Sequence, residues 1–406
     1  MSILIRLATD WELSKYIREA SNTQTPIEII GGGSKQSAGR PSQASVRICT
    51  NRLNTIHFYE PSELIMSADA GTPVAKIETE LATQGQMLAF EPVELGPLLG
   101  QPAGQSTVGG MFSTNICGSR RISSGAGRDH LLGISAVSGR AQTFNSGGRV
   151  LKDVAGIGLT RAVAGSWGTL AVITRVTFKV KPKPEETATV VLIGLSNELA
   201  VEAMGAALAM PFDVTAGVHL ETSLVKRLQQ EDFQSVANPI TALRLETFSK
   251  FLPRRIEFLK KALKTYGELY IVGNDASIAF WNELQQLSPM LGSDRQVWRI
   301  STLLNKGAHF INDIRRHMEV EVYFDWFGGL MWLLISEAVD AGAADIRRTL
   351  ATYGGHATLI RATDKIRSQV SVFQPLDSST EHITRNLKHA FDPDAVLNRA
   401  RMYTYL

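Results

Sequence analysis

Cysteine is scarce in this chain: only Cys49 and Cys117 occur among its 406 residues. They lie far apart and form no Cys-x-x-Cys motif, so alone they cannot build a zinc site, a disulfide framework or a four-thiolate iron–sulfur cluster. The His and acidic residues show no metal-ligand spacing either. The sequence therefore predicts a chain without a metal centre, working in a reducing compartment.

Long hydrophobic runs are also missing. Residues 1–20 mix charged and apolar side chains in a helix-like pattern and lack the apolar core of a signal peptide. The most apolar later stretch, residues 328–335, is far shorter than the roughly 20 residues that cross a bilayer. We therefore expect a cytoplasmic protein without a transmembrane segment.

Neither sign of charge predominates, because 42 basic residues face 39 acidic ones and the net charge is +3. This balance argues against a nucleic-acid-binding stripe or a dedicated surface for anionic lipids, and it favours a small-molecule partner. With 44% hydrophobic and 20% charged residues the composition is that of an ordinary globular protein. The length is roughly two to three times that of a typical domain, so we expect two domains.

Glycine is concentrated in the middle of the chain: 16 of the 34 glycines lie between Gly96 and Gly168. Glycine permits positive φ angles and close approach of a ligand to the main chain, so this density favours a loop-rich ligand site. Tight turns in a β-rich segment are the alternative for any single glycine.

The pattern of apolar residues predicts a mixed α+β fold. In the first part we expect a helix at 74–84 and strands at 26–30, 46–49, 55–58, 64–68 and 171–180. The Lys/Pro-rich segment 181–186 then marks a domain boundary. A second α/β unit follows, with strands at 189–193 and 242–246 and helices at 198–209 and 254–266. The segment 391–398 resembles a capped turn that packs back on a larger body.

The loop Gly31-Gly32-Gly33-Ser34-Lys35 follows an expected strand, which suggests contact with a phosphate. It is not a Rossmann GxGxxG loop, because Gln36 stands where the third glycine is required, and the chain has no Walker A motif. Successive N–H groups of such a loop can still form an anion-binding concavity.

Three segments together resemble the FAD-binding domains of the vanillyl-alcohol oxidase (PCMH) type: the triple-glycine loop, residues 105–133 and residues 147–174. With motifs of the second half, among them Gly354-Gly355-His356, they make the chain similar to the family of second FAD-binding chains in bacterial glycolate oxidase (glycolate dehydrogenase) complexes. The resemblance covers nearly the full chain. It implies an α+β fold with a PCMH-type FAD-binding domain of two α/β subdomains at 1–184. A smaller cap domain of sheet and helices is expected at 185–350, with the end of the cap and a returning tail at 351–406.

The resemblance also implies FAD as cofactor, held without a covalent bond because no histidine lies between Gly31 and Gly39. Residues expected to bind it are Gly31, Gly32, Gly33, Ser34, Lys35, Gly39, Thr107, Gly109, Gly110, Ser113, Thr114, Asn115 and Ile173. Lys35 would add charge at the pyrophosphate. The plainer alternatives are a solvent-facing lysine, a capped turn at 113–115 and a core residue at Ile173.

Oxidation of a 2-hydroxy acid requires a cation for the carboxylate and a base for the hydroxyl proton. Arg299, His356 and Arg361 are the candidates in the second domain, although His356 fits a structural histidine equally well. Arg120 and Arg121 suggest a patch for a partner or an acidic substrate, or simply a solvated surface pair. Arg128 and Asp129 suggest a structural ion pair.

By resemblance, the chain is expected to take part in oxidation of glycolate to glyoxylate, with a larger FAD subunit and an iron–sulfur subunit as partners. Any contact with the inner membrane would then be made through those subunits. Two alternatives remain: a self-sufficient FAD-dependent 2-hydroxy acid dehydrogenase, and a subunit that holds FAD for relay or assembly without substrate chemistry. The relay alternative gains weight because Ile157-Gly158 replaces a family Tyr-Asp pair. In the tail, Asn398-Arg399-Ala400-Arg401 replaces the family Asn-Pro-Gly-Arg.

Overall fold

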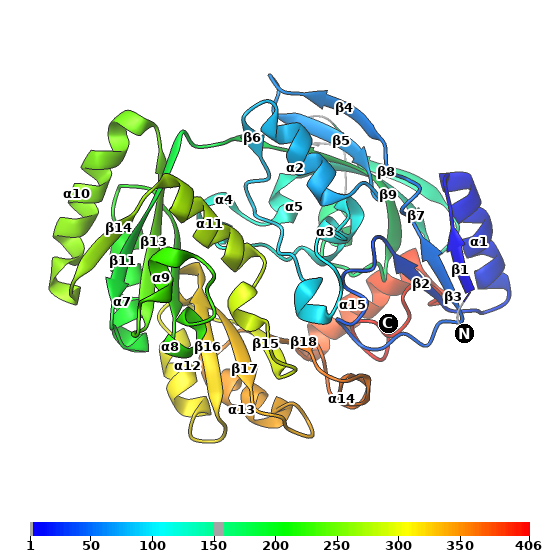
Figure 1. The fold of residues 1–406 in the computed structure, drawn as a ribbon. Helices are drawn as coiled ribbons and strands as arrows, with labels where there is room; N and C mark the ends of the chain where they lie inside the picture. The colour runs from blue at the N-terminus through cyan, green and yellow to red at the C-terminus, as the bar shows by residue number, and fades with distance from the viewer. Residues whose placement is uncertain (1–2, 149–157) are drawn as a thin grey trace. The chain divides into compact units, whose positions relative to one another are not determined.

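A computed structural model describes residues 3–148 and 158–406 of the chain (Figure 1). They form two compact units, each with its own core. Unit 1 comprises Met1–Cys117, Ala126–Lys183 and Pro375–Leu406, and unit 2 comprises Gly118–Gly125 and Pro184–Gln374. The expected pair Ile157-Gly158 falls partly outside the described residues.

Unit 1 begins with a small parallel sheet in which β3 (Val46–Cys49) lies between β1 (Ile3–Arg6) and β2 (Ile27–Ile30). The helix α1 (Asp10–Asn22) starts at a capping box, because the Thr9 hydroxyl accepts from the Glu12 N–H while Glu12 accepts from the Thr9 N–H. The expected helical pattern is wrong for residues 3–6. Their apolar, β-branched side chains suit a strand paired with β3.

The second sheet of unit 1 is antiparallel, in the order β4-β5-β9-β7-β8. Its strands are β4 (Ile56–Glu60), β5 (Ile65–Asp69), β7 (Leu131–Ser138), β8 (Thr143–Gly147) and β9 (Ala171–Lys179). The strands β6 (Gln86–Met87) and β10 (Lys181–Pro182) form a separate, two-stranded antiparallel sheet. The helices of unit 1 after α1 are α2 (Val74–Ala82), α3 (Val108–Thr114), α5 (Gly127–His130), α6 (Leu159–Val163) and α15 (Ser378–Phe391).

The last part of the chain belongs to the core of unit 1. Val396 and Leu397 are fully buried together with Ile27, Ile48 and Val172, so the segment after α15 packs on residues from both sheets. Leu397 also forms a parallel bridge to Ile27. Figure 1 shows α15 and the segment after it, in red, returning to the blue N-terminal strands.

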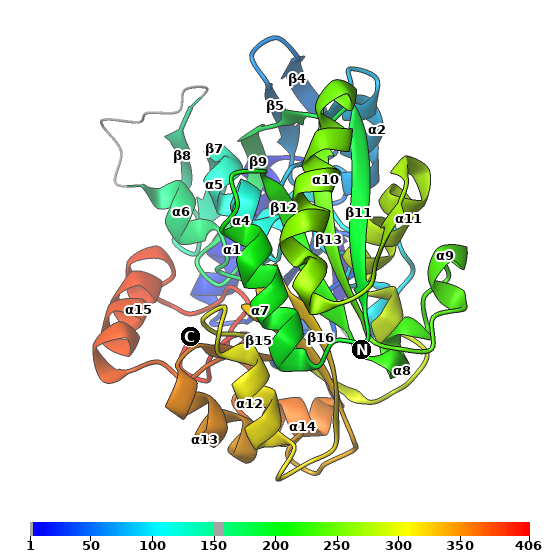
Figure 2. The same ribbon diagram turned by 90° about the vertical axis from the view of Figure 1, so that its left-hand side faces the viewer.

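Unit 2 contains an eight-stranded antiparallel sheet, ordered β14-β11-β13-β12-β16-β17-β15-β18. The strands are β11 (Glu186–Ile193), β12 (Val214–Leu220), β13 (Ile240–Thr247), β14 (Leu269–Val272), β15 (Gln296–Ser301), β16 (Val320–Asp325), β17 (Leu330–Ile335) and β18 (His356–Arg361). Its helices are α4 (Arg121–Ser124), α7 (Asn197–Leu208), α8 (Thr222–Val225), α9 (Glu231–Gln234), α10 (Leu252–Leu263), α11 (Asn274–Gln285), α12 (Gly307–Ile314), α13 (Ala343–Tyr353) and α14 (Asp364–Gln369). Helices α7 and α10 cover one face of the strands around β13 (Figure 2), and α11 packs on β11 from the other face (Figure 1).

The face of this sheet opposite to α7 carries a band of polar and aromatic side chains. Directly paired residues of antiparallel strands point to the same face. Trp332 is paired with Tyr323 on one side and with Arg299 on the other, so these three side chains lie on one face of β16, β17 and β15. The same register gives the full band: Arg244, Glu246, Arg299, Tyr323, Asp325, Trp332 and His356.

The expected α+β class is confirmed, and the expected strand at 46–49 is found with the same ends. The segment Gly118–Gly125 differs from expectation, since it clusters with unit 2 although the sequence places it within the first domain. Its side chains explain this: Ser119 donates to Asp325 at 3.0 Å, Trp326 donates to the Gly118 carbonyl at 3.0 Å, and Arg120 pairs with Glu246.

Candidate functional site

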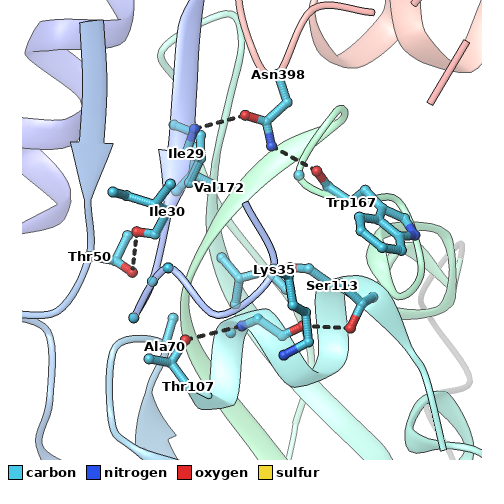
Figure 3. A pocket seen from close by; sticks show the side chains of 18 of the residues that line it. Ile29, Ile30, Lys35, Thr50, Ala70, Thr107, Ser113, Trp167, Val172 and Asn398 are labelled. Carbon is cyan, nitrogen blue, oxygen red and sulfur yellow. Dashed lines mark hydrogen bonds between the residues drawn. The ribbon is translucent and has the colours of Figure 1, made fainter. Parts of the chain in front are cut away.

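Unit 1 contains an open cavity. Its walls come from the end of β2 and the glycine loop, from α3, from the start of β9 and from the segment around Asn398 (Figure 3). Of the thirteen residues expected to bind the cofactor, all but Gly39 and Asn115 line it.

Gly39 and Asn115 have other partners. A Cβ on Gly39 would lie 2.9 Å from Nε of Arg401, so this glycine makes room for that arginine. Asn115 ends α3 at a φ of 51°, and its Oδ1 accepts from the Arg128 N–H at 2.9 Å. The capped-turn alternative therefore describes Asn115 well.

The glycines of the cavity bring chain segments together. A Cβ on Gly32 would stand 1.8 Å from the Gln105 carbonyl oxygen, and one on Gly109 would stand 2.7 Å from the Cβ of Ala70. Gly33 has a φ of +85°, which other residues rarely adopt. Glycine is needed at positions 32 and 109 because a Cβ atom would clash with the neighbouring segment. The main chains of the loop, of α3 and of the segment after β5 can therefore lie close together and form the wall of the cavity.

Lys35 places a partly buried cation beside the loop. Its Nζ donates to the hydroxyl oxygens of Ser106 at 3.1 Å and Ser34 at 3.4 Å. Burial lowers the pKa of Lys35, and the charge of Glu94 partly opposes this shift. Ser106 lies between the ammonium group and the Glu94 carboxylate, so an anionic ligand in the cavity would add a second counter-charge.

Two cavity residues, Asn398 and Arg401, were not expected from the sequence as ligand-site residues. Asn398 accepts from the Ile29 N–H at 2.7 Å and donates to the Trp167 carbonyl at 2.7 Å (Figure 3). The signal available in the sequence was the match of Asn398 and Arg401 to the family tail.

In unit 2, the structure brings together two of the three expected catalytic residues. Arg299 lies over the rings of Trp326 and Trp332, at 4.8 and 5.8 Å from their centres. Exposed His356 pairs with Ser301, two residues along β15 on the face of Arg299. Arg361 stands at the other end of β18, about 16 Å from His356 at 3.3 Å per residue. Its Nε donates to the Arg295 carbonyl at 2.8 Å.

Arg120 is a largely buried ion-pair residue and not a solvated one. Its Nε donates to Glu246 at 2.9 Å, while Arg244 lies 3.7 Å from the same carboxylate and 4.3 Å from the centre of the Trp281 ring. Burial by itself raises the pKa of Glu246, but Arg244 and Arg120 outweigh it and lower the pKa to about 2. The expected pair of Arg128 and Asp129 is found at 3.9 Å on the surface.

Comparison with known proteins decides the family. Residues 1–146 match the FAD binding domain family. Over 398 residues, the chain is 31% identical to glycolate oxidase subunit GlcE of Escherichia coli, covering 97% of both chains. This chain belongs to the GlcE family. A part of the chain is also 28% identical over 183 residues to glycolate oxidase subunit GlcD of Bacillus subtilis, covering 45% of this chain and 37% of that protein.

The fold of this GlcE-family chain is that of PCMH-type oxidases. It superposes on p-cresol methylhydroxylase with a TM-score of 0.73 at 13% identity, covering 98% of this chain and 88% of the other. The GlcE-family chain is an FAD-binding oxidoreductase, and its cavity suits that cofactor: the glycine loop offers main-chain N–H groups and Lys35 offers a partly buried cation.

Two further observations concern the described residues of this GlcE-family chain. No helix among them is long and apolar enough to span a membrane. Within residues 3–148 and 158–406, no three His, Cys, Asp or Glu side chains are grouped as metal ligands.

Proposed function

We propose that this chain is the FAD-binding subunit of a glycolate (2-hydroxy acid) dehydrogenase complex and takes part in the oxidation of glycolate to glyoxylate. The observation that carries the proposal is the 31% identity to GlcE along 97% of both chains. The cavity in unit 1 supports it, because the expected flavin-binding segments converge there from separate parts of the sequence.

The residues divide into two roles. The glycine loop, Lys35, Thr107, Gly109 and Gly110 hold the cofactor, which when bound accepts the two electrons removed from the hydroxy acid. Arg299 binds the substrate carboxylate, its guanidinium plane fixed by the two tryptophan rings. His356 accepts the hydroxyl proton, since it is exposed on the same face of the sheet.

The electrons must then leave the chain. Its two cysteines are too few for a four-thiolate cluster, so we assign the next carrier to an iron–sulfur partner, beside a larger FAD subunit. Glycolate gives up two electrons and two protons: His356 accepts the hydroxyl proton, the proton from the broken C–H bond is released to solvent, and the partner's clusters take up the electrons one at a time.

An anaerobic visible spectrum of the purified chain, taken before and after addition of glycolate or D-lactate, tests this proposal. A protein that purifies without flavin and does not take up added FAD would overturn it. Flavin bleached by substrate in the isolated chain supports the self-sufficient enzyme. Flavin bleached only in the assembled complex, and equally in Arg299→Met, supports a chain that relays electrons without binding substrate.

A further inference from the structure

We propose that the segment 392–401, here called the strap, fixes the shape of the FAD cavity through two positioning residues, Asn398 and Arg401. The inference rests on the proposal that this cavity holds FAD. Both residues line the cavity, and each bonds to main-chain atoms of the segments that form its walls.

Asn398 joins two walls with one side chain. Its Oδ1 accepts from the N–H of Ile29, in the strand that leads into the glycine loop, and its Nδ2 donates to the carbonyl of Trp167. Gly168 follows directly, and a Cβ there would lie 2.7 Å from Nδ2 of Asn398. The distance between β2 and the turn before β9 is therefore set by the length of this amide.

Arg401 holds the far side of the glycine loop. Its Nη2 donates to the carbonyls of Lys35 at 2.8 Å and Gln36 at 2.9 Å, and Arg40 donates its N–H to the Arg401 carbonyl at 2.9 Å. Glu28, 4% exposed, lies 3.5 Å from Nη1. One guanidinium thus ties Glu28 in β2 to the main chain at Lys35 and Gln36.

The first residue of the strap, Asp392, is held by an ion pair and by hydrogen bonds. Asp392, fully buried, pairs with Lys388 at 2.7 Å and accepts from the N–H groups of Val396 and Leu397. Lys388 also donates to the carbonyls of Thr169 and Leu397. These bonds fix the strap against unit 1, so Asn398 and Arg401 reach the cavity although they are far from β2 and the glycine loop in sequence.

A coupling follows from this arrangement. When two elements must be in place for a ligand to bind, the ligand stabilises both, and loss of one lowers affinity for the ligand. FAD binding should therefore protect the strap from hydrogen exchange, and loss of Arg401 should weaken FAD binding although no atom of FAD need touch Arg401.

The test compares Arg401→Met with Arg399→Met in the full chain. Arg399 is the matched control, since it is exposed and donates only to carbonyls of Ala395 and Asp394 within the strap. We expect the FAD dissociation constant to rise at least about tenfold in Arg401→Met, to recover in part in Arg401→Lys, and to stay within twofold of wild type in Arg399→Met.

Asn398→Asp supplies a second variant in case Arg401→Met does not fold, because it keeps the acceptor for Ile29 and removes the donor to Trp167. A purely structural role would lower the melting temperature equally with and without FAD and leave the dissociation constant unchanged, and this result would overturn the proposal. So would hydrogen exchange at 31–39 and 392–401 that FAD does not slow in the wild type. If the wild type fails to bind FAD at all, the proposed function fails, and the strap fails with it.

Discussion

The Nζ of Lys35 lies 3.1 Å from the hydroxyl oxygen of Ser106, and that hydroxyl in turn donates to Glu94 at 3.1 Å. The lysine charge is thus connected to a carboxylate only through a serine. Burial lowers the pKa of Lys35 and Glu94 opposes the shift. A diphosphate group placed in the cavity would favour the protonated amine.

FAD affinity should therefore depend on pH. Lysine is charged below its pKa, so the affinity of the wild type should fall as pH rises through the lowered pKa, whereas Lys35→Met should bind FAD about 10–100-fold more weakly at neutral pH and with a flatter profile. Titration of the FAD-free protein with FAD, followed by flavin fluorescence from pH 6 to 10, measures both. Lys76→Met, at an exposed position, is the control; equal profiles for Lys35→Met and the wild type would contradict the assignment.

The backbone at Ala400 offers a test of stability. Its φ is 58°, in the left-handed region that glycine adopts without the steric cost of a Cβ. Ala400→Gly should raise the free energy of unfolding by about 0.5–1 kcal/mol. Ala75→Gly, on the exposed side of α2, should lower it by a similar amount. Urea unfolding of the wild type, Ala400→Gly and Ala75→Gly measures both changes in the free energy of unfolding. Destabilisation by Ala400→Gly would show that the backbone at Ala400 is not strained.

The ion pair of Arg120 and Glu246 should contribute strongly to unit 2. Glu246→Gln leaves two arginines without their carboxylate, which should lower the free energy of unfolding by about 3 kcal/mol at pH 7. Because the folded pKa of Glu246 is about 2, this contribution is present above the ordinary pKa of 4.5 and is lost as pH falls from 4.5 towards 2. The difference between variant and wild type should shrink over that window.

Glu381→Gln is the contrasting change, since Glu381 and Arg385 form an exposed i,i+4 pair on α15. Here the loss should stay below about 0.5 kcal/mol. Chemical unfolding at pH 7, 5 and 3 measures how much each substitution, Glu246→Gln or Glu381→Gln, lowers the free energy of unfolding. Equal effects for both substitutions would mean that burial adds nothing to the Arg120 pair.

The flavin should be released intact when the protein is unfolded, because the loop from Gly31 to Gly39 contains no histidine for a covalent link. Precipitation with acid, followed by a spectrum of supernatant and pellet, tests this. Yellow colour that stays with the washed pellet would contradict the prediction.

Local patterns in the sequence were sufficient to predict several elements of both units. The strand at 46–49 and the helix starting at Val74 could be predicted because alternation or helical spacing of apolar residues is visible in a short window. In unit 2, β15 to β18 were not predicted as strands. β17 is buried along its whole length, so it has no alternation to detect.

The ligand cavity was predicted only where its residues form continuous motifs. The glycine loop and the segment around Gly109 could be found in this way. Asn398 and Ile29 are 369 residues apart in sequence, and no periodicity connects them. The contact between Gly39 and Arg401 could not be predicted for the same reason, since the two residues are far apart in sequence.

The assignment of Gly118–Gly125 to unit 2 has an evolutionary consequence. Recombination that exchanged only residues 184–374 for another cap would leave behind the segment whose Arg120 and Ser119 satisfy Glu246 and Asp325. The incoming sheet would meet an arginine and a serine selected for a different surface. In this chain residues 184–374 alone are therefore not a complete unit, and a change at Glu246 or Asp325 calls for a matching change in the Gly118–Gly125 segment.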